Sequence, residues 1–307
     1  MTAIESIEGI CEVTRHGPSD AAPELLIEIP HGAVDRAEFD ALRRRLRGPF
    51  PDELEAFFFV NTDIGAPEAA RHIARSLADG CRVVLLRSLV PRTFVDCNRV
   101  LDDGPPVAPG QLTPGLPQYV THDGDGTLLR SLHGQYQSMA DRAYAAVCGA
   151  GGLALTLHPY APRSVGISTV DDGIVRALRA AYEPDTYRRW PVRPPVDVID
   201  ETDDGRCLAP RDVVDVMLER YAAAGIEARR NATYRLHAGS MGHRLSLRYP
   251  GQCLCVELNR GELGDPFVPF RPVTISPTAV ARMADPIASA LSAGIESRRR
   301  SRQSRRG

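Results

Sequence analysis

Short apolar runs that alternate with amphipathic segments are the feature that most restricts the fold of this chain. Segments with apolar side chains at helical spacing are predicted to be helices, and short apolar runs are predicted to be strands. Breakers such as Pro and Gly mark where these elements end. The predicted strands are Glu24–Ile29, Phe57–Val60, Val83–Arg87, Leu153–His158, Val196–Ile199, Leu245–Tyr249 and Cys253–Leu258. The predicted helices are 35–47, 66–78, 127–149, 171–182, 210–224 and 277–293. Because helices and strands alternate, the sequence predicts a three-layer α/β domain with a mostly parallel sheet.

The length and composition are those of an ordinary globular protein. The 307 residues are 43% hydrophobic and 25% charged, which is compatible with one large domain. We expect that domain to cover 24–294, after an N-terminal extension at 1–23. Residues 295–307 are rich in Arg and Ser, and the last ten residues of the chain have no apolar side chain to bury. This segment is therefore predicted to form a basic, disordered tail.

Charge and cysteine content restrict the compartment and the partners. The sequence begins without a secretory signal and has no run of about 18 apolar residues, so the predicted location is cytoplasmic and no membrane contact is expected. A net charge of -2 argues against nucleic-acid binding, except through the basic tail. The seven cysteines are scattered and odd in number, which favours reduced thiols.

A short polar stretch follows the strand predicted at Val83–Arg87. It places Arg92, Asp96, Asn98 and Arg99 close together in sequence, before a Pro/Gly-rich loop at about 102–126 that is predicted to be a lid. In an extended segment, alternation puts an aspartate and an asparagine on one side, where they can fix the loop. The planar donors of an arginine match the two oxygens of a carboxylate. The stretch therefore indicates either recognition of a small carboxylate or a strand end with ordinary surface arginines.

Two histidines, His31 and His158, stand at the ends of predicted strands, where ligand crevices form in α/β sheets. Catalytic zinc commonly binds two histidines and one carboxylate and leaves a position for water. Asp63, at a turn, is one candidate for the acidic ligand, and Asp35, four residues after the first histidine, is its rival. As an alternative, Asp63 caps a helix. The residues thus suggest a mononuclear metal hydrolase, although no His-Glu-x-x-His motif is present.

Beyond these separate signals, the chain resembles the N-formylglutamate amidohydrolase family from about residue 24 to residue 270. The Asp-x-Asn-Arg element is the most specific part of the match, and the other elements gain weight from their order. The resemblance rests on Pro30-His31-Gly32, Thr62-Asp63-Ile-Gly65, Arg92 through Asp96-Cys-Asn98-Arg99, the strand ending at His158, Asn231-x-x-Tyr234 and Val256-Glu257-Leu-Asn259-Arg260.

The resemblance implies a zinc-dependent amide hydrolase with the fold of zinc carboxypeptidases and aspartoacylase, which is a three-layer α/β/α fold with a central mixed, mostly parallel sheet. It implies one Zn²⁺, or another divalent metal, held by His31, Asp63 and His158. It further implies Glu257 as the general base and Arg92 as the group that polarises the scissile carbonyl or binds a second carboxylate. The residues expected to bind the carboxylate-bearing amide substrate are Asn98, Arg99, Tyr160 and Asn231.

Two departures from the family pattern affect the expected substrate. The family often has Ser-His-Ser-Gly at the first histidine and Asp-x-His-Ser at the second, whereas this chain has Pro30-His-Gly-Ala33 and Thr156-Leu-His158-Pro159. An aspartate that commonly orients a metal-bound histidine is thus replaced by Thr156. N-formylglutamate is one expected substrate. A peptidase or deacylase with another substrate, and a non-catalytic protein that binds a ligand or a nucleic acid, are the alternatives.

Overall fold

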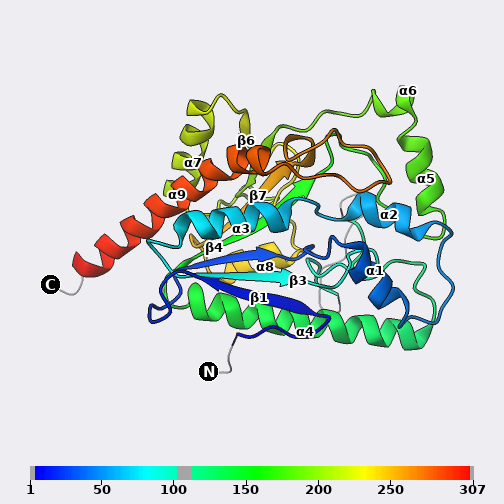
Figure 1. The fold of residues 1–307 in the computed structure, drawn as a ribbon, viewed down its shortest axis with the longest axis horizontal. Coiled ribbons are helices and arrows are strands. Elements are labelled where there is room, and N and C mark those ends of the chain that lie inside the picture. The colour runs from blue at the N-terminus through cyan, green and yellow to red at the C-terminus, as the bar shows by residue number, and fades with distance from the viewer. Residues whose placement is uncertain (1–3, 102–111, 305–307) are drawn as a thin grey trace.

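A computed structural model describes residues 4–101 and 112–304, which form a central mixed sheet (Figure 1). Within this part of the chain the strand order is β1-β3-β2-β4-β7-β5-β6. The β1/β3 and β7/β5 pairs are antiparallel and the other neighbours are parallel, so the predicted mixed, mostly parallel sheet is confirmed. The strands are β1 (Cys11–His16), β2 (Leu25–Ile29), β3 (Val83–Ser88), β4 (Leu153–Tyr160), β5 (Val196–Ile199), β6 (Ala228–Arg230) and β7 (Cys253–Asn259).

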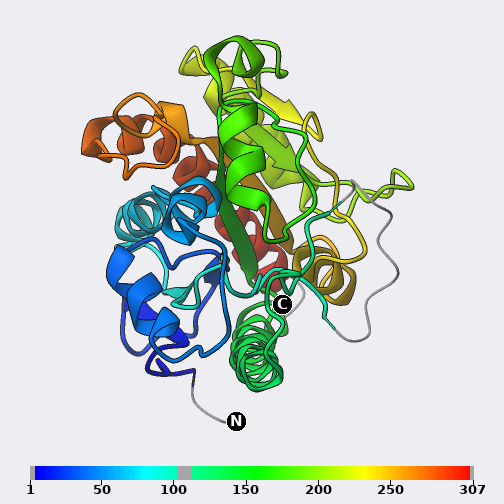
Figure 2. The same cartoon turned by 90° about the vertical axis from the view of Figure 1, so that its right-hand side faces the viewer.

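Helices cover both faces of the sheet, which gives the three layers seen in Figure 2. Helices α3, α7 and α9 pack together on one face, and α4 and α8 lie on the other. The helices are α1 (Arg36–Arg43), α2 (Leu54–Asn61), α3 (Ala66–Leu77), α4 (Asp123–Val147), α5 (Ile174–Ala181), α6 (Pro184–Tyr187), α7 (Arg211–Ala223), α8 (Met241–Arg248) and α9 (Pro277–Ser304), with a 3₁₀ turn, η1, at Arg260–Glu262.

The two faces of the sheet differ in chemistry. In β4, Leu155 and Leu157 belong to the core formed with α3, α7 and α9. Because side chains alternate along a strand, Thr156 and His158 lie on the opposite face. The strand β7 alternates in the same way, so Glu257 shares the face of His158. Polar side chains therefore gather on one face, near the carboxyl ends of the parallel strands.

Two predicted strands are wrong, because both segments are helical. Phe57–Val60 lies within α2, and Leu245–Tyr249 overlaps α8. A short apolar run such as the first fits a buried helix as well as a buried strand, so its pattern alone cannot decide. In the second, Met241 and Leu245 are buried four positions apart, which is the spacing of a helix face.

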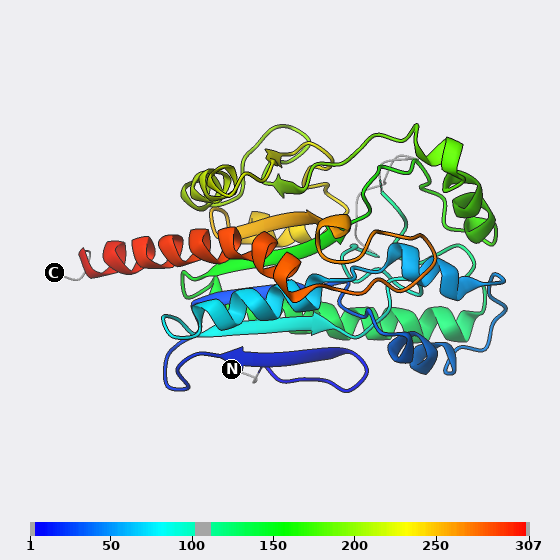
Figure 3. The same ribbon diagram turned by 45° about the horizontal axis from the view of Figure 1, so that its top comes forward.

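The two ends of the chain take part in the domain. Residues 11–16 form β1 at the sheet edge, so part of the predicted N-terminal extension belongs to the sheet (Figure 3). The predicted disorder of the basic tail is wrong for 295–304, which continue α9. Arg299 forms an ion pair with Glu24, and Arg298 and Arg302 donate hydrogen bonds to backbone carbonyls. Residues 305–307, like 102–111 of the predicted lid, lie outside the described residues.

Two further findings concern the helices and the cysteines. None of the helices formed by the described residues is long and apolar enough to cross a membrane. All seven cysteines are free thiols, as their odd number predicted. The cytoplasmic location itself stays a prediction.

Candidate metal centre and active site

A cavity of about 500 Å³ opens at the carboxyl ends of β2, β4 and β7. Its walls come from these strand ends, the segment 92–99, the loop 160–170 and helices α2 and α5. The structure thus brings together residues that are far apart in sequence. Of the predicted site residues, those that line the cavity are His31, Asp63, Arg92, Asn98, Arg99, His158, Tyr160 and Glu257.

A tight turn after β2 places His31 at the edge of the sheet. The Gly32 N–H donates to the carbonyl of Ile29 at 3.2 Å. A Cβ atom at position 32 would collide with the Arg87 side chain and lie 3.1 Å from the Ser88 carbonyl, so only glycine fits beside the histidine. The hydroxyl of Thr62 donates to the Ala33 carbonyl at 2.8 Å, which ties this turn to the segment that carries Asp63.

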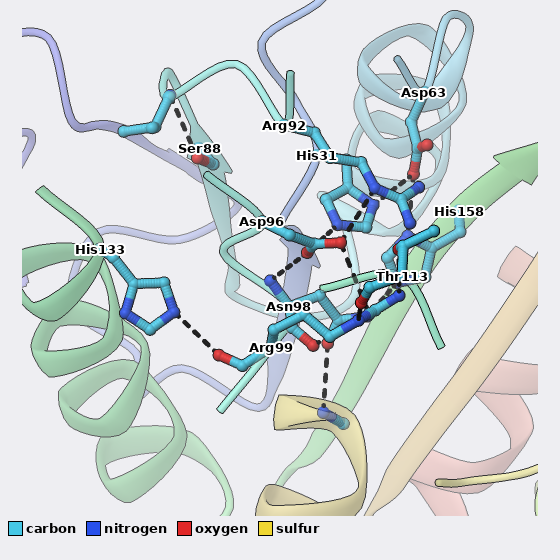
Figure 4. A network of polar contacts seen from close by, with 12 residues as sticks. His31, Asp63, Ser88, Arg92, Asp96, Asn98, Arg99, Thr113, His133 and His158 are labelled. Carbon is cyan, nitrogen blue, oxygen red and sulfur yellow. Dashed lines mark hydrogen bonds and ion pairs between the residues drawn. The ribbon is translucent and has the colours of Figure 1, made fainter. Parts of the chain in front are cut away.

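His31, Asp63 and His158 form a buried group (Figure 4). The Asp63 Oδ2 atom lies 3.3 Å from His31 Nδ1 and 2.8 Å from His158 Nδ1. The two imidazole rings are 4.9 Å apart between centroids. Bonds of 2.0–2.1 Å to a tetrahedral zinc ion put ligand atoms about 3.3 Å apart, so the donor set and its spacing fit a divalent metal.

The structure also separates the two candidate acidic ligands. Asp35 is exposed and forms the N-cap of α1, with Glu38 in a capping box. Asp63 is buried and does not cap α3, because Gly65 occupies the N-cap position of that helix. The geometry therefore favours Asp63 as a ligand over both its rival and its alternative role as a helix cap.

Asp96 holds the far side of the His31 ring. Its Oδ1 atom lies 2.7 Å from His31 Nε2 and accepts the backbone N–H of Asn98 at 2.8 Å. Its Oδ2 atom accepts from Arg92 Nε at 3.0 Å. With Nε2 engaged by a carboxylate, Nδ1 is the nitrogen left to face Asp63, which is how a second carboxylate commonly orients a metal ligand. The sequence predicted that Asp96 fixes the loop and did not indicate its contact with His31.

The buried charges support a site for a cation. Burial by itself would raise the pKa of Asp63 and of Asp96, but the neighbouring imidazoles and, for Asp96, the Arg99 and Arg92 guanidiniums hold both pKa values well below the ordinary range. Burial and Arg92 would lower the pKa of His31, yet the two carboxylates raise it. Both carboxylates are therefore ionised and attract positive charge to this point.

Glu257 lies beside His158 in the sheet. The two residues are paired between the parallel strands β4 and β7, so their side chains extend from the same face. Burial raises the pKa of Glu257 to about 7, with His158 acting against the rise and Asp63 adding to it. Among residues 4–101 and 112–304 no arginine forms an ion pair with this carboxylate, which leaves it directed at the cavity.

Asn98 and Arg99 are held in place from several sides. The Asn98 amide contacts His158 Nε2 at 3.4 Å and accepts from the Gly242 N–H at 3.3 Å. Arg99 donates from Nε to the Thr113 carbonyl at 3.0 Å and lies 3.6 Å from the Asp96 carboxylate. Burial lowers the pKa of Arg99. The position of Arg99 is thus compatible with the predicted contact with a substrate and with an ion pair to Asp96.

Arg193 is a cavity residue that the sequence did not indicate. Its guanidinium lies over the rings of Tyr160 and Tyr234, at 5.0 and 5.2 Å from their centroids. It also donates to the Tyr234 hydroxyl at 2.6 Å, while the Tyr160 hydroxyl donates to the Pro194 carbonyl. Tyr160 therefore lines the cavity as a support for this cation. No motif surrounds Arg193, so only the fold could reveal it.

Asn231 does not line the cavity. It has a left-handed backbone, with φ of 51°, and its side-chain oxygen accepts the N–H groups of Asp200 and Glu201 at 3.0 and 3.2 Å. These bonds fix the chain after β6, so that Thr233 and Tyr234 reach the cavity instead. The structure thus gives Asn231 a supporting position rather than the predicted contact with a substrate.

Comparison with known proteins supports the fold. No family model matches the sequence, and no curated protein matches it. The chain is similar to the crystal structure of N-formylglutamate amidohydrolase from Ralstonia eutropha JMP134, with a TM-score of 0.56 and 18% identity over 94% of this chain and 99% of that one. It is also similar to a gene product from Agrobacterium tumefaciens, with a TM-score of 0.50 and 14% identity over 96% of both chains. The predicted resemblance is therefore confirmed for the fold.

Proposed function

We propose that the protein is a metal-dependent amidohydrolase that cleaves a small acylated substrate bearing a carboxylate. The observation that carries this proposal is the convergence of two buried imidazoles and a carboxylate beside Glu257, at the sheet edge where ligands bind in α/β folds. The fold shared with an N-formylglutamate amidohydrolase supports the same class of reaction. N-formylglutamate is one candidate substrate, and another acylated amino acid is the alternative.

His31, Asp63 and His158 would hold one zinc ion or a similar divalent metal. When bound, such an ion would act as a Lewis acid that lowers the pKa of water and polarises a carbonyl. Asp96 keeps the His31 ring in the orientation that presents Nδ1. The burial of all three candidate ligands strengthens their attraction for a cation.

Glu257 is the proposed general base. A pKa near 7 suits this role, because a base works best when its pKa lies close to the working pH. The carboxylate removes a proton from the attacking water and then delivers it to the leaving nitrogen. Its position beside His158 keeps it within the candidate metal centre.

Three arginines and one asparagine are assigned to substrate binding and to the scissile carbonyl. Arg92 keeps Nε on Asp96 and is assigned to the scissile carbonyl, where a preorganised donor stabilises developing negative charge. Asn98 and Arg99 are assigned to the substrate carboxylate. Arg193, held between two tyrosine rings, is a further donor on the same cavity.

Metal analysis tests this proposal most directly. We expect one zinc ion per chain after reconstitution, and loss of that ion in His31→Ala and His158→Ala. His72→Ala is the matched control, because His72 lies on α3 and pairs with Asp285 away from the cavity. Hydrolysis of formyl, acetyl and longer acyl amino acids should require the metal. A folded wild-type protein that cannot be loaded with zinc, manganese or cobalt would overturn the proposal.

A further inference from the structure

The cavity continues from the candidate metal centre to an apolar wall. Phe57 and Val60 of α2 pack in one apolar cluster with Ile174 and Leu178 of α5, and together they form this wall, with Tyr182 just beyond α5. Figure 2 looks onto the end of the molecule where α5 lies in front of the sheet. Asp63 follows α2 directly, so the wall begins next to a candidate metal ligand.

The wall is fixed by contacts outside the cavity. Arg179 of α5 forms an ion pair with Glu53, the residue before α2, at 2.7 Å. The Trp190 indole donates to the Ala181 carbonyl at the end of α5, at 3.2 Å. The Gln118 N–H donates to the Val170 carbonyl at 2.8 Å and ties down the loop that leads to the helix. The apolar surface therefore exists before a ligand binds.

The charged side chains that adjoin the wall are engaged with the protein. Arg260 donates to the Val60 carbonyl at 3.0 Å and lies over the Phe267 ring, although its Nε atom has no hydrogen-bond partner among the described residues. Arg163 donates to the Trp190 carbonyl at 2.6 Å. Asn98 and Arg99, the proposed carboxylate ligands, come from a different segment, next to Gly242 and Thr113.

The size of the cavity exceeds what a formyl group requires. A formyl group adds one carbon and one oxygen to an amino acid, whereas a cavity of about 500 Å³ lies in the range that accommodates drug-sized ligands, roughly 300–1,000 Å³. If Asn98 and Arg99 hold the carboxylate of the amino-acid part, the space beside α2 and α5 is left for the acyl part.

We propose that the acyl group of the substrate is apolar and several carbons long, and that it binds against the wall formed by α2 and α5. This inference rests on the proposed amidohydrolase function and adds a substrate class to it. The apolar side chains of the wall gain by excluding water from such a chain, and each buried methylene is worth about a fourfold gain in affinity. A charged acyl group of similar length would lose its hydration there.

A series of N-acyl glutamates with one amine part and increasing acyl length tests the proposal. From acetyl through butanoyl to hexanoyl, kcat/KM of the metal-loaded protein should rise about fourfold per methylene. Butanoyl and succinyl groups have the same number of carbons, and the butanoyl compound should be preferred at least tenfold. A flat series would overturn the inference. A preference for succinyl would also overturn it and would assign Arg260 to a second carboxylate.

Substitutions on α5 test whether the acyl group binds at Leu178. Leu178→Trp should fill the subsite and abolish the gain with acyl length. Leu178→Ala, which cannot overpack the wall, should weaken the hexanoyl preference about tenfold. Ala177→Trp is the control of equal size, because Ala177 is exposed on the same helix and does not line the cavity. Equal responses to the substitutions at 177 and 178 would contradict a subsite at Leu178.

A binding measurement separates this inference from the proposed function. Calorimetry with the metal-free protein should give hexanoylglutamate a higher affinity than acetylglutamate, and Leu178→Trp should remove the difference. If the loaded protein hydrolyses no acyl amino acid but this preference persists, the hydrolase proposal fails and the apolar subsite stands. If turnover occurs without any preference in rate or affinity, the hydrolase stands and the subsite fails.

Discussion

The two faces of the central sheet use the same strands for different purposes. In β4, Leu155 and Leu157 enter the core with α3, α7 and α9, whereas Thr156 and His158 lie on the face of α4. On the first face the side chains of this strand are all apolar. On the second face, buried positions are occupied by polar side chains. Alternation within one strand thus separates the residues that stabilise the fold from those that carry chemistry.

The polar face is possible because its groups satisfy one another. Glu28 on β2 is buried, and its carboxylate accepts hydrogen bonds from Tyr136 and Tyr144 at 3.1 and 2.8 Å. The Tyr144 hydroxyl also contacts the Thr156 hydroxyl at 2.9 Å, so Thr156 has a partner other than His158. Buried polar groups of this kind contribute less to stability than apolar ones, because they lose hydration on folding. We therefore expect substitutions on the two faces to have different consequences.

The largest effect is expected on the polar face, where Glu257→Gln removes the proposed base. The variant should lose about 10²–10⁴-fold in kcat, because general base catalysis contributes that much, while its zinc content and melting temperature are kept. Steady-state kinetics, metal analysis and thermal denaturation measure these three quantities. Glu262→Gln, after β7 and partly exposed, is the control. Equal activity of the two variants would remove Glu257 from the mechanism.

A substitution on the opposite, apolar face should change the stability of the fold and leave the candidate site unaffected. Leu157 is fully buried and adjoins His158 in sequence, so Leu157→Ala should lower the free energy of unfolding by about 2–5 kcal/mol. Zinc content and kcat of the folded fraction should stay close to wild type. Chemical denaturation measures the free energy of unfolding. Leu247→Ala, at a leucine 43% exposed, should change it by less than about 0.5 kcal/mol. A zinc site lost in Leu157→Ala would show that the faces are not independent.

This division explains how much of the fold the sequence could predict. The apolar runs of β2, β3, β4 and β7 were recognisable because their length and flanking residues identify buried strands. Phe57–Val60 is equally apolar but helical, since burial on all sides removes the periodicity that distinguishes the two structures. The helical end of α9 depends on contacts of Arg299 and Arg302 with distant residues, which no local pattern contains.

The candidate site was predictable where a strand end fixes the position of a residue. His31 and His158 follow from this rule, because parallel strands end at a common edge. Asp96 as the partner of His31, and Arg193 between two tyrosines, depend on loop geometry and had no signal of their own. Asn231 was predicted from a motif, yet its neighbour Tyr234 is the residue that lines the cavity.

A smaller effect is expected for Asp96→Asn, which tests how the polar face is organised. The substitution keeps the shape but removes the charge that orients His31, so zinc affinity should fall about 10–100-fold, as for other partners of metal-bound histidines. Competition with a chelator measures this affinity. Asp141→Asn on α4, a residue that pairs with Arg244, is the control. Unchanged affinity would mean that the contact at 2.7 Å does not orient the ligand.

The smallest effect concerns Glu28, whose burial raises its pKa although the two tyrosine hydroxyls act to lower it. A carboxyl whose pKa is higher in the folded than in the unfolded protein holds its proton longer when folded, so its contribution to stability is complete at low pH and is lost as pH rises through the folded pKa. Glu28→Gln removes this dependence. The free energy of unfolding of the variant, relative to wild type, should therefore increase with pH by up to about 1.4 kcal/mol per pH unit across that interval. Denaturation at a series of pH values measures the difference, and a constant difference would mean that the polar face stabilises the charged carboxylate as well as water does.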